Sequence, residues 1–199
     1  EKKVKIVQLM SSDYAYYIWP CSVVLTEYIY FIRNELQNKR VLELGCGTAL
    51  PGTVAAMYGA NVTLSDLTQD LILDNIREVV ALNTAQCQKE PKVIGLNWGE
   101  VDETLVQLPP QDIILGADLL YDESDFENLV VTVAFLLEQH PQGRFITSYQ
   151  NRSESYLCEL LLLLEKWNLA LVQIQLDDFF PQHKRDLLQD KDIQLFVIQ

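Results

Sequence analysis

Short aliphatic and β-branched runs alternate along the chain with longer segments of helical periodicity. The short runs have the length and composition of β-strands and fall at residues 39–44, 61–65, 92–97, 112–117, 144–149, 169–176 and 193–199. Helical periodicity follows each of the first five, at residues 51–59, 69–85, 101–107, 124–139 and 153–167. This repetition predicts an α/β fold with a mostly parallel sheet and helices on both faces.

The two ends of the chain depart from this repetition. Residues 177–192 are rich in charge and contain Pro181, so we expect a loop or a short turn of helix there. Without a strong helix between them, the last two strands should pair antiparallel. Residues 20–36 form a predicted amphipathic helix that begins at Pro20. We expect one domain over residues 1–199, with a lead-in segment and helix at 1–38 and a core at 39–199.

A glycine turn follows the first strand candidate, in the sequence VLELGCGTALPG at residues 41–52. A dinucleotide site needs a third glycine at the start of the helix, where backbone N–H groups meet the pyrophosphate. Counted from Gly45 and Gly47, that position falls on Leu50, and Pro51, which has no N–H, comes next. Glu43 is also poorly suited to a nearby pyrophosphate. The turn therefore favours a phosphate-free, positively charged nucleoside, and S-adenosylmethionine is such a molecule.

An acidic residue near the end of the second strand is expected to hold the ribose hydroxyls of such a cofactor. Asp66 stands at the matching place, 21 residues after Gly45. Glu43 and the backbone of the turn would then hold the amino-acid end. The alternative for Asp66 is a plain helix cap, a position that Asp often takes.

Six segments of the chain carry a resemblance to a known family. They are YIWPCSVVLTEYI before the first strand, VLELGCGTALPG, VTLSDL, GLNWG after the third strand, ILGADLLYD at the fourth and SYQNRS after the fifth. Their order and spacing resemble those of the seven-β-strand methyltransferases of the family-16 type, the lysine methyltransferase-like group, over nearly the whole chain. The resemblance implies an S-adenosylmethionine-dependent enzyme with the Rossmann-like class I methyltransferase fold, in which the last strand is antiparallel.

The resemblance also implies where the cofactor is held. Trp19 would line the mouth of the pocket, and Glu43, Gly45 and Gly47 would hold the methionine end of the cofactor. Asp66 would hold the ribose. Asn97 and Trp98 would flank the adenine, and Ala117 would pack beside the cofactor. An adenine face stacks well on an aromatic ring, although Trp98 could instead be a core tryptophan.

A D-x-x-Y motif follows the fourth strand, at Asp118 to Tyr121. By resemblance, its carboxylate and phenol hold and orient the incoming amine. An aromatic wall from Tyr121 or Tyr149 would favour a cationic substrate. We expect Arg152 to pair with an acidic residue or to fasten the substrate loop. The alternative for Asp118 is a helix cap or a loop hydrogen bond.

Two further features bear on this resemblance. Ala49 stands where the family usually has a third glycine, and it is expected to tighten the cofactor loop. The acidic site could also accept an arginine guanidinium, through paired hydrogen bonds from Asp118, Asp122 or Glu123.

The charge of the chain is strongly negative, at −13, and unevenly distributed. Residues 93–143 contain ten acidic residues and neither lysine nor arginine. Such a surface repels phosphate backbones, so we expect no nucleic-acid substrate. It would attract a basic protein, although an acidic surface can also serve solubility alone.

Other features exclude several classes of protein. Apolar runs are interrupted well before the roughly 20 residues that cross a bilayer, so no membrane span is expected. Four separated cysteines without a C-x-x-C pair suit a reducing compartment without a disulfide, and we expect the protein in the cytoplasm and the nucleus. Two histidines in loop-like sequence make a metal site unexpected.

The sequence begins at Glu1, so we expect that a leader could be missing. A monomer is expected.

Together these observations predict a protein methyltransferase that modifies a lysine or arginine of a basic protein, possibly a histone. Three alternatives stay open at this point. They are a small-molecule methyltransferase, an NAD-dependent oxidoreductase on a related fold, and a cofactor-binding interaction module without turnover.

Overall fold

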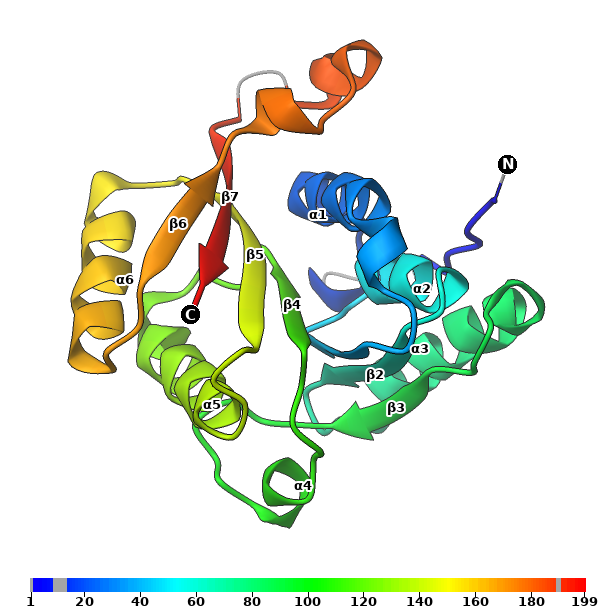
Figure 1. Cartoon of the computed structure of the whole chain (residues 1–199), viewed down its shortest axis with the longest axis horizontal. Coiled ribbons are helices and arrows are strands. Elements are labelled where there is room, and N and C mark those ends of the chain that lie inside the picture. The colour runs from blue at the N-terminus through cyan, green and yellow to red at the C-terminus, as the bar shows by residue number, and fades with distance from the viewer. Residues whose placement is uncertain (1, 9–13, 189–190) are drawn as a thin grey trace.

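A computed structural model describes residues 2–8, 14–188 and 191–199 of the chain. Its strands form a seven-stranded sheet in the order β3-β2-β1-β4-β5-β7-β6 (Figure 1). The strands are β1 Arg40–Leu44, β2 Asn61–Asp66, β3 Lys92–Gly95, β4 Ile113–Ala117, β5 Arg144–Gln150, β6 Leu171–Ile174 and β7 Ile193–Ile198.

The helices alternate with the strands along the chain. The α-helices are α1 Pro20–Phe31, α2 Leu50–Met57, α3 Asp70–Asn83, α4 Glu103–Val106, α5 Phe126–Glu138 and α6 Glu154–Lys166. Short 3-10 helices are η1 Tyr14–Tyr16, η2 Arg33–Glu35, η3 Thr84–Gln86, η4 Glu123–Asp125, η5 Leu176–Asp178 and η6 Gln182–Leu188.

The order of elements predicted from the sequence is confirmed, and the differences lie at the ends of elements. β3 ends at Gly95, which pairs with Asp66, the last residue of β2. Beyond Asp66, β2 offers no residues with which β3 could pair. The helix expected at 20–36 ends at Phe31 and continues after Ile32 as η2. The expected loop at 177–192 contains two 3-10 helices in its described part.

The pairing of the strands agrees with the predicted mixed sheet. β1 pairs parallel with β2 and β4, and β4 pairs parallel with β5. β7 lies antiparallel between β5 and β6. The expectation of an antiparallel last strand is therefore confirmed.

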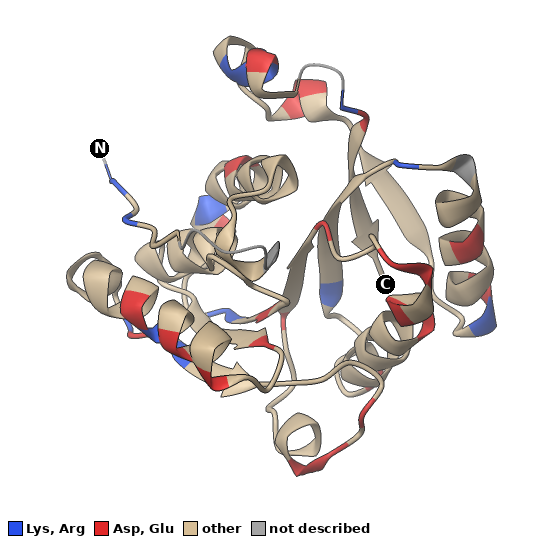
Figure 2. Ribbon diagram, turned by 180° about the vertical axis from the view of Figure 1, so that it is seen from behind, with Lys and Arg blue, Asp and Glu red and all other residues tan. Residues whose placement is uncertain are grey.

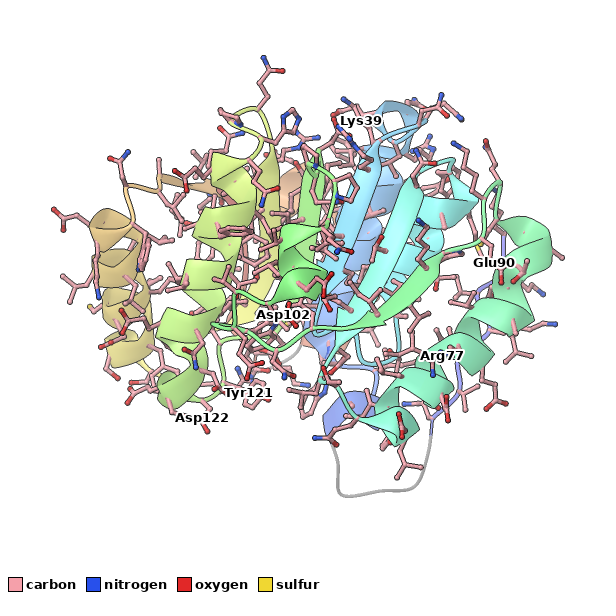
Figure 3. The ribbon with its side chains drawn as sticks, turned by 90° about the horizontal axis from the view of Figure 1, so that it is seen from below. Lys39, Arg77, Glu90, Asp102, Tyr121 and Asp122 are labelled. Carbon is pink, nitrogen blue, oxygen red and sulfur yellow. The ribbon has the colours of Figure 1, made fainter. Side chains whose placement is uncertain are left out.

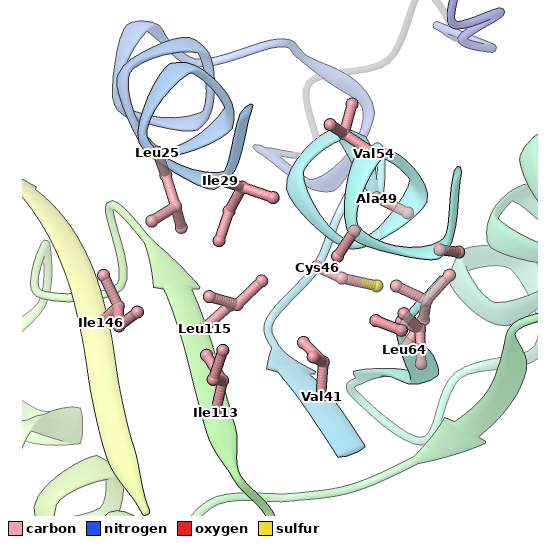
Figure 4. Packing of buried hydrophobic residues seen from close by; sticks show 14 of the residues in the cluster. Leu25, Ile29, Val41, Cys46, Ala49, Val54, Leu64, Ile113, Leu115 and Ile146 are labelled. Carbon is pink, nitrogen blue, oxygen red and sulfur yellow. The ribbon is translucent and has the colours of Figure 1, made fainter. Parts of the chain in front are cut away.

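Both faces of the sheet are covered by helices. Neighbouring residues of a strand point to opposite faces, so each strand contributes to two hydrophobic clusters. Val41 packs in one cluster with residues of α1, α2 and α3, whereas Leu42 packs in another with residues of α5 and α6. In Figure 4, Leu25 and Ile29 of α1 lie over Ile113, Leu115 and Ile146 of the sheet. Helices therefore cover the sheet on both sides, as expected.

The position of β1 determines where a ligand can bind. β1 lies between β2 and β4, so the chain leaves it in one direction along the sheet and returns on its other side. In open α/β sheets such a reversal leaves a crevice at the carboxyl ends of the strands. Among the helices in the described ranges, none combines the length and apolar character that crossing a bilayer requires.

Candidate active site

A pocket of about 610 Å³ opens at the carboxyl ends of β1, β2 and β4. This volume suits a cofactor-sized ligand. Its wall is built by the loops after successive strands, at residues 45–48, 66–67, 96–98 and 100, 117–119, 121 and 125, and 152. Residues 15, 17, 19 and 22, which precede or begin α1, and Ile72 of α3 also line it.

The glycine turn after β1 forms the centre of the pocket. Gly45 and Gly47 have φ values of 51° and 49°, in the left-handed region that glycine adopts without strain. A Cβ on Gly45 would lie 2.8 Å from Leu119 Cδ2 and 3.0 Å from Trp98 Cζ2. The turn therefore packs closely against other parts of the pocket wall. Ala49 also has a positive φ, 54°, and is fully buried at the start of α2, outside the wall.

Asp66, the last residue of β2, lines the pocket and is bonded to the glycine turn. Its Oδ2 accepts a hydrogen bond from the Gly47 N–H at 2.7 Å, and its Oδ1 accepts one from the Leu67 N–H at 2.8 Å. These two hydrogen bonds orient the Asp66 carboxylate at the edge of the glycine turn. The position matches the one expected for a ribose-binding residue.

Glu43 lies behind the turn, and this corrects its expected contact with the amino-acid end of the cofactor. Its side chain is 1% exposed and is not part of the pocket wall. Its Oε2 accepts a hydrogen bond from the Gly52 N–H at 2.8 Å, which ties β1 to the first turn of α2. Burial raises its pKa to about 8. Near neutral pH, Glu43 is therefore mainly an uncharged structural group.

Asn97 and Trp98 line the pocket beyond β3, as expected. The Asn97 Oδ1 accepts a hydrogen bond from the Thr68 N–H at 3.3 Å, and its Nδ2 donates to Glu100 Oε2 at 3.1 Å. Trp98 also packs against the cluster between the sheet and α5, so the alternative of a core tryptophan holds in part. The Trp19 ring makes an edge contact with Tyr17, with centroids 5.0 Å apart, at the lead-in side of the pocket.

Asp118 follows β4 and forms a charged pair inside the pocket. Its two oxygens accept hydrogen bonds from the Arg152 guanidinium at 2.8 and 2.7 Å. The Asp118 side chain is 3% exposed, and its backbone has a left-handed φ of 59°. Its N–H donates to the Ser148 carbonyl of β5 at 2.8 Å. The pairing expected for Arg152 is confirmed, and Ala117 lies beside it in the wall.

The two tyrosines expected at the acceptor side have different positions. Tyr121 is 45% exposed and lines the pocket. Tyr149 is 1% exposed, stacks on Phe196 in the core and lies outside the wall. Because Tyr149 points to the α5 side of β5, the expectation that it forms an aromatic wall for the substrate is wrong.

Some wall residues were not singled out in the sequence. Tyr17 precedes the helical pattern and begins the segment YIWPCSVVLTEYI, but nothing in that segment indicates that its ring lines a pocket. Asp125 stands among several acidic residues, so the sequence alone does not distinguish it from them. Two residues expected as possible guanidinium ligands lie outside the wall, Asp122 and Glu123. The Asp122 Oδ1 accepts hydrogen bonds from the N–H and the hydroxyl of Ser124 instead.

The charges around the pocket favour a cation. Among the residues that the structure describes, its wall contains the carboxylates of Asp66, Glu100, Asp118 and Asp125, against the single guanidinium of Arg152. Acidic residues also outnumber basic ones over the described ribbon (Figure 2). A sulfonium or ammonium group would be stabilised here, whereas a pyrophosphate would be repelled.

Comparisons with known proteins identify the family of this chain. A family model described as "Lysine methyltransferase" matches residues 1–161. "Histone-arginine methyltransferase METTL23" of Xenopus laevis is 44% identical over 178 residues, which are 89% of this chain and 74% of the relative. The protein of the same name in Homo sapiens is 41% identical over 82% of this chain and 84% of its own. "Protein N-lysine methyltransferase METTL21A" of Danio rerio is 40% identical over 60% of this chain and 54% of its own.

Solved structures share the fold at low sequence identity. The glycopeptide N-methyltransferase MtfA has a TM-score of 0.65 and 14% identity, over 92% of this chain and 91% of its own. Magnesium protoporphyrin IX methyltransferase from Synechocystis, with bound SAM, has a TM-score of 0.63 and 15% identity, over 90% of this chain and 80% of its own. The predicted class I methyltransferase fold is confirmed.

Proposed function

Since this chain belongs to the lysine methyltransferase family, we propose that it methylates an arginine side chain in a basic protein segment, with a histone as a candidate substrate. The enzyme is an S-adenosylmethionine-dependent protein methyltransferase. The observation on which the cofactor site rests is the hydrogen bond between the Gly47 N–H and Asp66 Oδ2, which joins the two parts of the pocket that would hold a nucleoside.

The described residues fit S-adenosylmethionine. The left-handed glycines bring backbone close to a ligand without side chains in the way. Asp66 would accept hydrogen bonds from the ribose hydroxyls, and Trp98 with Asn97 would flank the adenine. When bound, the cofactor supplies a methyl group that its sulfonium activates. The chain therefore needs mainly to place an acceptor nitrogen close to that methyl group, in line with the bond that breaks.

The side of the pocket after β4 is suited to hold the acceptor. Tyr121 lies there with an exposed ring, which can pack against a cationic side chain. Arg152 holds Asp118 in place by two hydrogen bonds. Tyr121 orients the acceptor, and the Asp118–Arg152 pair holds the loop beside it in place. No strong acid is required because the methyl donor already carries a good leaving group.

We propose arginine rather than lysine as the acceptor because of the activity for which the relatives are named. The METTL23 proteins, which match more of this chain than the METTL21A proteins, are named as histone-arginine methyltransferases. The D-x-x-Y motif at Asp118 and Tyr121 favours lysine as the second candidate, by resemblance to lysine-modifying members. In either case the charge of the pocket supports a basic substrate.

Mass spectrometry of core histones and a protein extract, after incubation with the enzyme and isotope-labelled S-adenosylmethionine, tests the proposal. We expect labelled methyl groups on arginine residues. Label on lysine alone would replace arginine with the second candidate. Cofactor binding without transfer to any protein would instead support an interaction module.

A further inference from the structure

Asp118 is the carboxylate of the D-x-x-Y motif, but it already binds a cation of the protein itself. Both of its oxygens bind the Arg152 guanidinium, in the paired geometry that a substrate guanidinium would itself adopt. The side chain is also almost fully buried. Removing Arg152 from it would leave a buried carboxylate without its partner, which is costly. A substrate cation therefore needs a different carboxylate.

Two of the other wall carboxylates are also engaged and lie toward the nucleoside side. Asp66 is bonded to the backbone N–H groups of Gly47 and Leu67. Glu100 accepts a hydrogen bond from Asn97, one of the residues after β3. Neither lies in the loop after β4.

Asp125 differs from these three in its surroundings. It lines the pocket, is partly buried and directly precedes α5. Its carboxylate forms no capping hydrogen bond to α5, and within the described residues no ion pair involves it. A negative charge at the start of a helix is stabilised by the helix dipole. Its backbone N–H donates to the Asp122 carbonyl at 3.1 Å, which fixes the turn.

The loop that carries Asp125 also places an aromatic ring beside the pocket. Tyr121 and Asp122 lie next to each other at one edge of the molecule (Figure 3). Tyr121 belongs to the wall and Asp122 does not. Residues 93–143, which include this loop, contain neither lysine nor arginine that could neutralise Asp125 from within the segment.

We propose that the Asp125 carboxylate binds the cationic side chain of the protein substrate, while Asp118 and Arg152 serve as a fixed internal pair. Asp125 is then a specificity-determining residue, and Asp118 is a positioning residue that holds the loop. This inference rests on the proposed function, because it assigns the substrate contact within the same site.

Peptide binding in the presence of S-adenosylhomocysteine tests the assignment without requiring turnover. The probes are a synthetic glycine–arginine peptide and the same peptide with citrulline, a neutral isostere, in place of arginine. We expect the wild-type enzyme to prefer the arginine peptide by about tenfold or more, as befits a charge-assisted hydrogen bond. Asp125→Asn should remove most of that preference, and Asp125→Glu should restore part of it.

Asp122→Asn is the matched control, because it removes a carboxylate from the same loop but outside the pocket wall. It should keep the wild-type preference, and every variant should bind S-adenosylhomocysteine as the wild type does. Two outcomes overturn the inference: an Asp125→Asn enzyme that keeps the preference for arginine, or a wild-type enzyme that shows none. Failure of the wild type to bind S-adenosylhomocysteine or to label any protein would overturn the proposed function itself.

Discussion

The Arg152 guanidinium, just after β5, holds both carboxylate oxygens of Asp118, just after β4, at 2.8 and 2.7 Å. The pair joins two loops of the pocket and fixes a residue whose backbone is left-handed, with φ at 59°. Because Asp118 belongs to the motif expected to receive the acceptor, this internal pair changes how the acceptor side is understood.

Removing the guanidinium should destabilise the protein. We expect Arg152→Ala to lower the free energy of unfolding by about 1–3 kcal/mol, because it leaves a buried carboxylate unsatisfied. Urea unfolding measures the change. Arg77→Ala is the control, since Arg77 pairs with Asp74 on an exposed helix face, where such pairs contribute about 0.3–0.5 kcal/mol. Equal effects of the two substitutions would argue against a fixed pair at Asp118.

The buried carboxyl of Glu43 should make stability depend on pH. Burial raises its pKa from 4.5 to about 8, so the folded state keeps a proton that the unfolded state loses. The stability contributed by the protonated form is complete below about pH 4.5 and is lost as the pH rises through about 8. Glu43→Gln, which retains an acceptor for the Gly52 N–H, should therefore gain stability relative to the wild type over this range. Urea unfolding at several pH values checks this, and parallel pH profiles would contradict it.

A side chain at Gly45 should weaken cofactor binding. Gly45→Ala places a Cβ against Leu119 and Trp98 and imposes left-handed strain of about 1–2 kcal/mol. We expect calorimetry to show affinity for S-adenosylhomocysteine reduced by about tenfold or more, since the strain and the displacement of Trp98 both act on the pocket. Gly59→Ala imposes the same kind of strain outside the pocket wall, at a φ of 91°. It should destabilise the fold but leave the affinity unchanged. A loss of affinity in both variants would point to a general effect on folding.

The two tyrosines considered for the acceptor side should respond differently to loss of the hydroxyl. Tyr121→Phe changes the pocket wall, so we expect kcat/KM for the protein substrate to fall, by about threefold or more if a hydrogen bond of ordinary strength is lost. The Tyr149 hydroxyl faces Asn151 at 3.4 Å and lies outside the wall, so Tyr149→Phe should leave turnover unchanged. Steady-state methyl transfer measures both. A larger decrease of kcat/KM in Tyr149→Phe than in Tyr121→Phe would indicate that Tyr149 belongs to the acceptor site.

The fold could be predicted from the sequence because local patterns decide most of it. The aliphatic strands, the helical periodicity between them and the weak connection before residue 193 are sufficient to predict a mixed sheet with an antiparallel last strand. The ends of elements depend on pairing instead: β3 ends where β2 does, at the Gly95–Asp66 pair. No property of residues 96 and 97 themselves indicates this.

The site was predictable where a residue follows directly from its strand. Asp66, Asn97 and Asp118 come at strand ends, and strand ends meet at one edge of a parallel sheet. Glu43 and Tyr149 lie within strands, where the direction of the side chain and the depth of burial decide their role. Glu43 points toward α2 and Tyr149 toward the core between the sheet and α5. Tyr17 and Asp125 reach the pocket through tertiary folding alone.

Titration of S-adenosylhomocysteine into the wild type and into Asp66→Asn, followed by calorimetry, tests the cofactor site most directly. Asp70→Asn is the control, because Asp70 is an exposed acidic residue in the first turn of α3 and lies outside the wall. We predict that the wild type and Asp70→Asn bind with equal affinity and that Asp66→Asn binds about tenfold or more weakly, from the loss of charge-assisted hydrogen bonds to the ribose. A wild-type protein that does not bind the ligand, or an Asp66→Asn variant that binds it equally well, would contradict the assignment of this pocket.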